Sequence, residues 1–206
     1  MPGGPGRRDV LGGAALLALV VGVPAAVVRL SRPAGPEASE RQLAIIREAA
    51  QLTLPRTATP GAGDVGVGDF VALALAHGLD GTRAPAAGST MPVTIRRHAR
   101  DDGTLDYLDW LEWQLDSRTR GDFLTASVER RRAALSAVDT EAFAPNAGES
   151  PWTKLKALIL SGYYTSQVGG SKELRYELVP GRFDADLPYL PGTPAWSSDW
   201  TAVEFG

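Results

Sequence analysis

Cysteine is absent from this sequence of 206 residues, and histidine occurs only at His77 and His98. Without cysteine the chain forms no disulfide, carries no lipid anchor on cysteine and offers no thiolate to a metal or an iron–sulfur cluster. Two histidines do not favour a zinc or copper site built by the protein alone. No haem-attachment motif is present either. The composition therefore argues against a metal or haem protein.

A basic excess is lacking as well, because 21 Lys and Arg residues face 24 Asp and Glu residues, which gives a net charge of −3. Nucleic-acid binding requires a basic face, so that class of function is disfavoured. No Gly-x-Ser-x-Gly elbow accompanies the two histidines, so a serine triad is not supported. His77 ends an apolar helical face and is interpreted as a packing residue, while His98 lies among arginines in a loop with no specific role expected.

The N-terminus has the pattern of a twin-arginine export signal over residues 1–30. Arg7 and Arg8 precede a mildly apolar run at residues 11–28, which is rich in Gly and Ala. A positive n-region followed by such a run marks a targeting segment rather than part of the fold. The alternative is a single membrane anchor, since about 18 apolar residues lie at the short edge of a bilayer span. The signal predicts export of a folded chain to the periplasm or the outer face of the cytoplasmic membrane.

After a Pro- and Gly-containing linker at residues 31–38, the sequence predicts a mainly α-helical bundle domain over residues 39–168. Apolar residues recur there at helical spacing. The strongest start signal is Ser150 as the cap with Pro151 at the first helical position, and Thr104 is the expected cap of the third helix. Arg96, Arg97 and Arg100 are interpreted as a solvated face within residues 78–103, a stretch with no readable pattern. The five expected helices begin and end near residues 39–54, 68–76, 104–115, 122–138 and 150–165.

Glycines at positions 61, 63, 66 and 68 follow the first of these helices. A dinucleotide-binding loop requires a strand before its glycines, so a helix–loop–helix turn is the better interpretation. From residue 169 to 206 the chain becomes a long irregular tail rich in proline and aromatic residues. Such a tail has too much proline for long helices and too many aromatic side chains for an idle disordered segment. We expect it to pack on the bundle or on a partner, since Tyr and Trp dominate interface energetics.

Two stretches resemble the gluconate 2-dehydrogenase subunit 3 family. The first is the run Leu-Pro-Arg-Thr-Ala-Thr-Pro-Gly-Ala at residues 54–62, followed by Gly-Val-Gly-Asp-Phe-Val at residues 66–71. The second is Gly-Tyr-Tyr-Thr-Ser at residues 162–166, followed by Gly169, Tyr176 and Val-Pro-Gly at residues 179–181. Ala58 departs from the family pattern, which usually has Asp there, so a turn hydrogen bond is expected to be lost.

The resemblance implies a small, non-catalytic subunit of a sugar or sugar-acid dehydrogenase. Members of the family accompany a larger flavoprotein of the glucose–methanol–choline class, which carries FAD, and a multihaem cytochrome c often takes the electrons onward. The small subunit is expected to bind no cofactor itself, to supply the twin-arginine signal for the pair and to support maturation of the flavoprotein. The candidate residues of the partner interface are Thr59, Pro60, Tyr163, Tyr164, Tyr176, Pro180, Phe183, Tyr189, Trp196 and Trp200.

Two other functions stay open at this point. A stand-alone envelope enzyme would use Tyr163 or Tyr164 as an acid, although tyrosines at a helix end are usually packing residues. A sugar-binding module would use Trp196 and Trp200 as stacking platforms. Turnover by the isolated chain would support the enzyme, and ligand-dependent tryptophan fluorescence without a partner would support the module.

Overall fold

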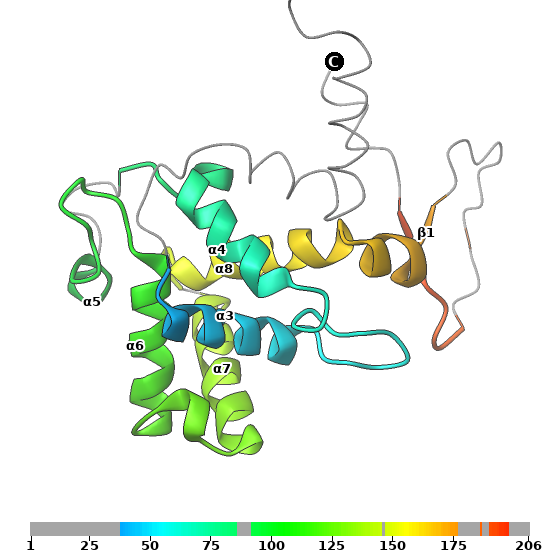
Figure 1. The fold of residues 1–206 in the computed structure, drawn as a ribbon, viewed down its shortest axis with the longest axis horizontal. Coiled ribbons are helices and arrows are strands. Elements are labelled where there is room, and N and C mark those ends of the chain that lie inside the picture. The colour runs from blue at the N-terminus through cyan, green and yellow to red at the C-terminus, as the bar shows by residue number, and fades with distance from the viewer. Residues whose placement is uncertain (1–37, 86–91, 146, 177–185, 187–189, 198–206) are drawn as a thin grey trace, which may run out of the picture.

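A computed structural model describes residues 38–85, 92–145, 147–176, 186 and 190–197. The described residues are mainly helical, as predicted (Figure 1). The export signal with Arg7 and Arg8, and all of the linker before Ala38, lie outside them. Among the described residues, no helix has the length and apolar character needed to cross a bilayer.

Five longer helices form the body of the protein, in the order expected from the sequence. Three of them, α3, α4 and α8, pack together, and α6 and α7 run side by side at a steep angle to α3 (Figure 1). Their bounds are α3 Glu40–Thr53, α4 Val67–His77, α6 Tyr107–Thr119, α7 Val128–Ala142 and α8 Pro151–Tyr164. Shorter elements are the helix α5 Val93–Arg96, the 3-10 turns η1 Leu79–Gly81 and η3 Phe123–Thr125, and the π-helical turn η4 Gly169–Glu173.

The helix ends follow the capping chemistry of the sequence. Ser39 and Gln42 form a capping box at the start of α3, and the Ser150 side chain accepts a hydrogen bond from the backbone of Trp152 at the start of α8. Such caps satisfy backbone N–H groups that the first helical turn leaves without partners. The predicted start of α8 at Ser150 and Pro151 is therefore confirmed.

Two predicted helix starts are wrong. Asp106, not Thr104, caps α6, and Thr104 instead donates through its backbone and hydroxyl to Asp102. Asp122 does not open the fourth long helix, because its carboxylate caps the short turn η3, and Ser127 then caps α7. Two caps five residues apart interrupt one apolar pattern, and helical periodicity does not reveal such a break.

A single apolar core joins the five helices. Its fully buried side chains come from α3, α4, α6, η3 and α8, and they include Ile46, Val71, Leu111, Phe123, Leu155 and Ile159. Burying a side chain of this size stabilises a protein by about 1.5–3 kcal/mol. Helices α4 and α8 approach closely at Gly162, where an added Cβ would stand 2.6 Å from the Phe70 ring. A residue larger than glycine at this position would have to displace the Phe70 ring.

Part of the predicted tail has regular structure. Strands β1 Leu174–Tyr176 and β2 Ala195–Ser197 pair in parallel, with Tyr176 opposite Ser197 and Arg175 opposite Trp196. The sequence analysis does not anticipate this pair, because a three-residue strand is too short to show alternation. Strand β1 contacts η4, the turn that follows α8, and β2, which contains Trp196, pairs with β1 (Figure 1).

Candidate functional site

The loop between α3 and α4, residues 54–66, meets the C-terminal end of α8 at one extremity of the molecule (Figure 1). This is the helix–loop–helix turn expected for the glycine-rich segment. Residues 55–58 at its tip are exposed, while Gly61 and Ala62 are buried. The loop therefore has an anchored base and a projecting tip.

Side-chain hydrogen bonds to backbone atoms fix the base of the loop. Asp64 accepts from the backbone N–H of Gly61 at 2.8 Å and forms an ion pair with Arg56 at 2.7 Å. The bond from Gly61 and the neighbouring Arg56 both lower the pKa of the Asp64 carboxyl. Gln51, on the last turn of α3, accepts from the backbone N–H of Gly63 at 2.8 Å. The loop conformation is thus held by groups on both sides of it.

The two tyrosines at the end of α8 have different environments. Tyr163 is buried, with 4% of its surface exposed, and its hydroxyl donates to the carbonyl oxygen of Pro60 at 3.0 Å. Tyr164 is 38% exposed, and its ring stacks edge-on against Tyr163 with the centroids 5.3 Å apart. Tyr163 therefore holds the loop from inside, and Tyr164 is the tyrosine that faces outward.

The turn that follows α8 completes this end of the molecule. The Thr59 hydroxyl donates to the Glu173 carboxylate, which connects the loop to η4. An added Cβ on Gly169 would stand 2.0 Å from the carbonyl oxygen of Tyr163, so the tight turn requires glycine here. Thr59, Pro60, Tyr163 and Tyr164 are therefore brought together, as the shared motif would lead one to expect. Four further candidates, Pro180, Phe183, Tyr189 and Trp200, lie outside the described residues.

Sequence reasoning missed Gln51 and Glu173 at this site. Neither residue belongs to a recognisable local pattern, because each acts across a sequence separation of 12 residues or more. Glu173 lies between Lys172 and Arg175, and these neighbours offer no signal that would pair it with Thr59. Only the spatial arrangement of the loop and η4 identifies these contacts.

The interpretation of His98 as a residue without a specific role is wrong. Its side chain is 4% exposed, and Nδ1 lies 2.6 Å from a carboxylate oxygen of Asp109 on α6. The imidazole also packs against Trp113, whose ring in turn has the Arg97 guanidinium 4.6 Å from its centroid. His98 therefore attaches the segment before α6 to that helix. Its partner Asp109 lies 11 residues further along the chain, so the local sequence does not reveal the contact.

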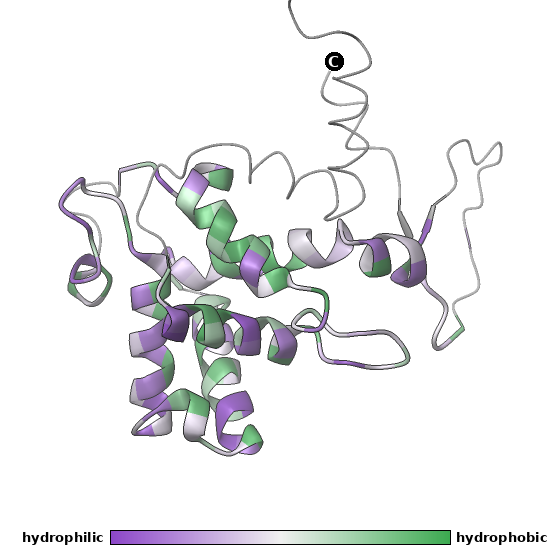
Figure 2. Cartoon of the chain, in the orientation of Figure 1, coloured by the Kyte–Doolittle hydropathy of each residue, from purple (hydrophilic) through white to green (hydrophobic). Residues whose placement is uncertain are grey.

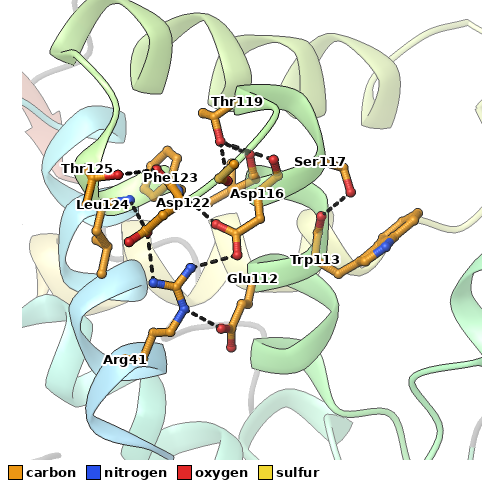
Figure 3. A network of polar contacts seen from close by, with 12 residues as sticks. Arg41, Glu112, Trp113, Asp116, Ser117, Thr119, Asp122, Phe123, Leu124 and Thr125 are labelled. Carbon is orange, nitrogen blue, oxygen red and sulfur yellow. Dashed lines mark hydrogen bonds and ion pairs between the residues drawn. The ribbon is translucent and has the colours of Figure 1, made fainter.

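A second polar cluster surrounds Arg41 of α3 (Figure 3). The guanidinium contacts Glu112 at 2.6 Å, Asp116 at 2.6 Å and Asp122 at 2.8 Å. Asp122 and the other two carboxylates raise the pKa of Arg41 above its usual range, and Arg41 lowers that of Asp122. One arginine thereby joins α3, α6 and η3.

Among the described residues, no group of three or more His, Asp or Glu side chains is arranged so that it could hold a metal ion. A hollow of about 200 Å³ lies between α3, α7 and α8. Asp139 on its wall accepts from Lys156 at 2.7 Å and from the Trp152 indole at 2.6 Å. Burial raises the pKa of Asp139, but the hydrogen bonds from Lys156 and Trp152 lower it by more, so the net shift is downward. The carboxylate is therefore already stabilised as an anion.

The fold and this end of the molecule define a small helical protein with an anchored, projecting loop. The family model of gluconate 2-dehydrogenase subunit 3 matches residues 40–181, from the start of α3 to beyond β1. The chain belongs to this family, whose name implies association with a dehydrogenase complex. No curated protein and no solved structure matches the chain in the other two comparisons.

Proposed function

We propose that this chain is the non-catalytic small subunit of an FAD-dependent sugar or sugar-acid dehydrogenase of the envelope. The observation that carries the proposal is the family match over residues 40–181, which covers all five long helices. In this proposal the FAD belongs to the catalytic flavoprotein, and a cytochrome c with several haems accepts the electrons in a further subunit. The small subunit supports maturation and stability of the flavoprotein.

The N-terminal sequence supports the export part of the proposal. Arg7 and Arg8 before a mildly apolar run fit a route that carries folded proteins. In this proposal the flavoprotein binds FAD before export, has no signal of its own and leaves the cytoplasm folded and attached to this chain. The complex would then work in the periplasm or on the outer face of the cytoplasmic membrane.

Co-expression tests the proposal. A candidate catalytic flavoprotein of the glucose–methanol–choline class from the same organism is produced with and without this chain, and FAD per polypeptide, soluble yield and periplasmic fraction are measured. With the small subunit present, we expect higher FAD occupancy and transfer of the flavoprotein to the periplasm. Equal FAD loading, solubility and export in both cultures would refute the accessory role.

A further inference from the structure

The hollow between α3, α7 and α8 is lined by side chains of two kinds. Its apolar part comes from Leu52, Leu135 and Trp152. Its polar part consists of one arginine, one lysine, one aspartate and two hydroxyl residues, namely Arg132, Lys156, Asp139, Thr53 and Ser136. A concave site with apolar walls and a few convergent polar groups is the usual form of a small-molecule site.

A single stripe of α7 forms one wall of the hollow. Figure 2 shows hydrophobic residues beside hydrophilic ones along this helix. The stripe repeats at the spacing of one helix face and consists of Arg132, Leu135, Ser136 and Asp139. Across from it, Trp152 and Lys156 lie one turn apart on α8. Because Arg132 and Ser136 are exposed, the hollow is open to solvent on the side of these residues.

Asp139 has one carboxylate oxygen that is not engaged by its neighbours. Lys156 at 2.7 Å and the Trp152 indole at 2.6 Å both donate to Oδ1. Among the described residues, no donor is bonded to Oδ2. An ionised carboxylate can only accept hydrogen bonds. Asp139 therefore offers an acceptor to any ligand in the hollow that carries a donor.

Arg132 supplies a cation at the opposite end of the stripe. Its guanidinium forms no ion pair within the described part of the chain, although its charge contributes to the lowered pKa of Glu129 one turn earlier. The neighbouring Arg131, by contrast, is paired with Glu48 at 3.0 Å and lies outside the hollow. A guanidinium binds a carboxylate through two parallel hydrogen bonds. Arg132 is therefore suited to the acid group of a ligand.

The charges around the hollow favour one kind of ligand. Arg132 and Lys156 against Asp139 leave one positive charge in excess, so a monoanion fits. A ligand ammonium group at Asp139 would be repelled by Lys156, which lies 2.7 Å from the same carboxylate. A hydroxyl group donates to Asp139 without this repulsion. Because Arg132 and Asp139 lie two turns apart, about 10 Å along the axis of α7, the acid and hydroxyl groups must be separated by several carbon atoms.

We propose that this hollow binds a small hydroxycarboxylate, with its carboxylate on Arg132, its hydroxyl on Asp139 and its carbon chain against the apolar wall. The volume of about 200 Å³ is below the range of about 300–1,000 Å³ that drug-sized ligands occupy, which limits the ligand to a short chain. All of the lining residues belong to this chain. The inference is therefore independent of the proposed dehydrogenase partner.

Titration of the full chain with three matched four-carbon acids tests the proposal. The compound γ-hydroxybutyrate carries both groups, butyrate lacks the hydroxyl, and γ-aminobutyrate has an ammonium group in its place. The indole N–H of Trp152, which is bonded to Asp139, is the NMR reporter, and that of the buried Trp110 is the internal reference. Sodium chloride at equal ionic strength gives the effect of salt alone.

We expect γ-hydroxybutyrate to shift the Trp152 resonance with saturation and a Kd of about 1–10 mM, and the other two acids to bind more weakly. Arg132→Gln should weaken binding by at least about tenfold, because the charge-assisted hydrogen bonds to the carboxylate are lost. Arg130→Gln is the matched control. Arg130 is an exposed arginine of the same helix that does not line the hollow, so this variant should bind as wild type does.

The outcomes separate the site from its details. Both arginines are exposed, so both variants should keep the wild-type circular dichroism. A titration without saturation, a shift that sodium chloride reproduces, or equal weakening by both variants overturns the site. Binding of butyrate or γ-aminobutyrate as tight as that of γ-hydroxybutyrate overturns the assignment of the hydroxyl to Asp139, and with it the hydroxycarboxylate as the ligand.

Discussion

Tyr163 and Tyr164 are adjacent residues of one type with opposite orientations. Residues next to each other on a helix are about 100° apart, so one of two neighbours can be buried while the other faces solvent. The hydroxyl of the buried Tyr163 has a partly buried acceptor in the Pro60 carbonyl, whereas the exposed Tyr164 presents its ring to the surface. The shared motif contains both residues, but only the structure separates the residue that holds the loop from the one available to a partner.

Tyr163→Phe removes one hydroxyl and keeps the aromatic ring. We expect it to lower the free energy of unfolding by about 1 kcal/mol, or the melting temperature by about 2–4 °C, since the partly buried Pro60 carbonyl loses its donor. Amide hydrogen exchange at residues 55–62 should become faster. Tyr164→Phe is the matched control and should change neither quantity measurably. Equal behaviour of the two variants would contradict the role given to the Tyr163 hydroxyl.

The sequence predicts part of the site and misses the rest for a physical reason. Thr59, Pro60 and Tyr163 belong to motifs of a known family, so their proximity follows from the resemblance. Glu173 and Gln51 are ordinary polar residues whose partners are set by how the loop folds back on α3 and η4. Non-local hydrogen bonds of this kind leave no trace in residue spacing.

At the scale of elements, five long helices follow from apolar periodicity, and most of their ends follow from caps and proline. The predicted helix starts are wrong where a polar side chain binds residues outside its own helix. Asp122 resembles the N-cap of a long helix, but it caps η3 and also binds Arg41 of α3 (Figure 3). Asp116 likewise accepts from the backbone of Phe123 while it binds Arg41. The break before α7 is therefore stabilised by contacts with another helix.

The Arg41 cluster predicts a dependence of stability on pH. Arg41 lowers the pKa of Asp122, and a carboxyl with a lowered pKa stabilises the fold above its ordinary pKa of about 4. That stability is lost as the pH falls through the lowered pKa. In Arg41→Gln, we expect lower stability than wild type near neutral pH and a difference that shrinks below about pH 4. Urea unfolding across this range measures the effect.

Arg47→Gln is the control for this experiment. Arg47 contacts one carboxylate, that of Asp69, and both side chains are about half exposed. A single exposed pair contributes about 0–1 kcal/mol, so this variant should remain close to wild type at every pH. If the difference in free energy of unfolding between Arg41→Gln and wild type stays constant at acidic pH, the Arg41 cluster is not the source of the acid sensitivity.

At the scale of the whole molecule, the sequence predicts an N-terminal export segment ahead of the folded helical domain. The domain belongs to a family of dehydrogenase subunits, and in our proposal it holds the flavoprotein. The segment at residues 1–30 would then be the export signal for both proteins. A substitution in the signal should therefore change the location of the partner without changing its FAD content.

Replacing both Arg7 and Arg8 by lysine tests this coupling, because it keeps the positive charge and removes the twin-arginine pattern. We expect the small subunit and the flavoprotein to accumulate together in the cytoplasm, still bound to each other and with FAD occupancy unchanged. Cell fractionation with immunoblotting, and flavin absorbance of the purified complex, provide the two readouts. Arg32→Lys, in the predicted linker, is the control and should leave export intact. Unchanged export of both proteins would refute the signal, whereas a retained small subunit with an exported flavoprotein would refute co-export alone, because the flavoprotein would then have its own route across the membrane.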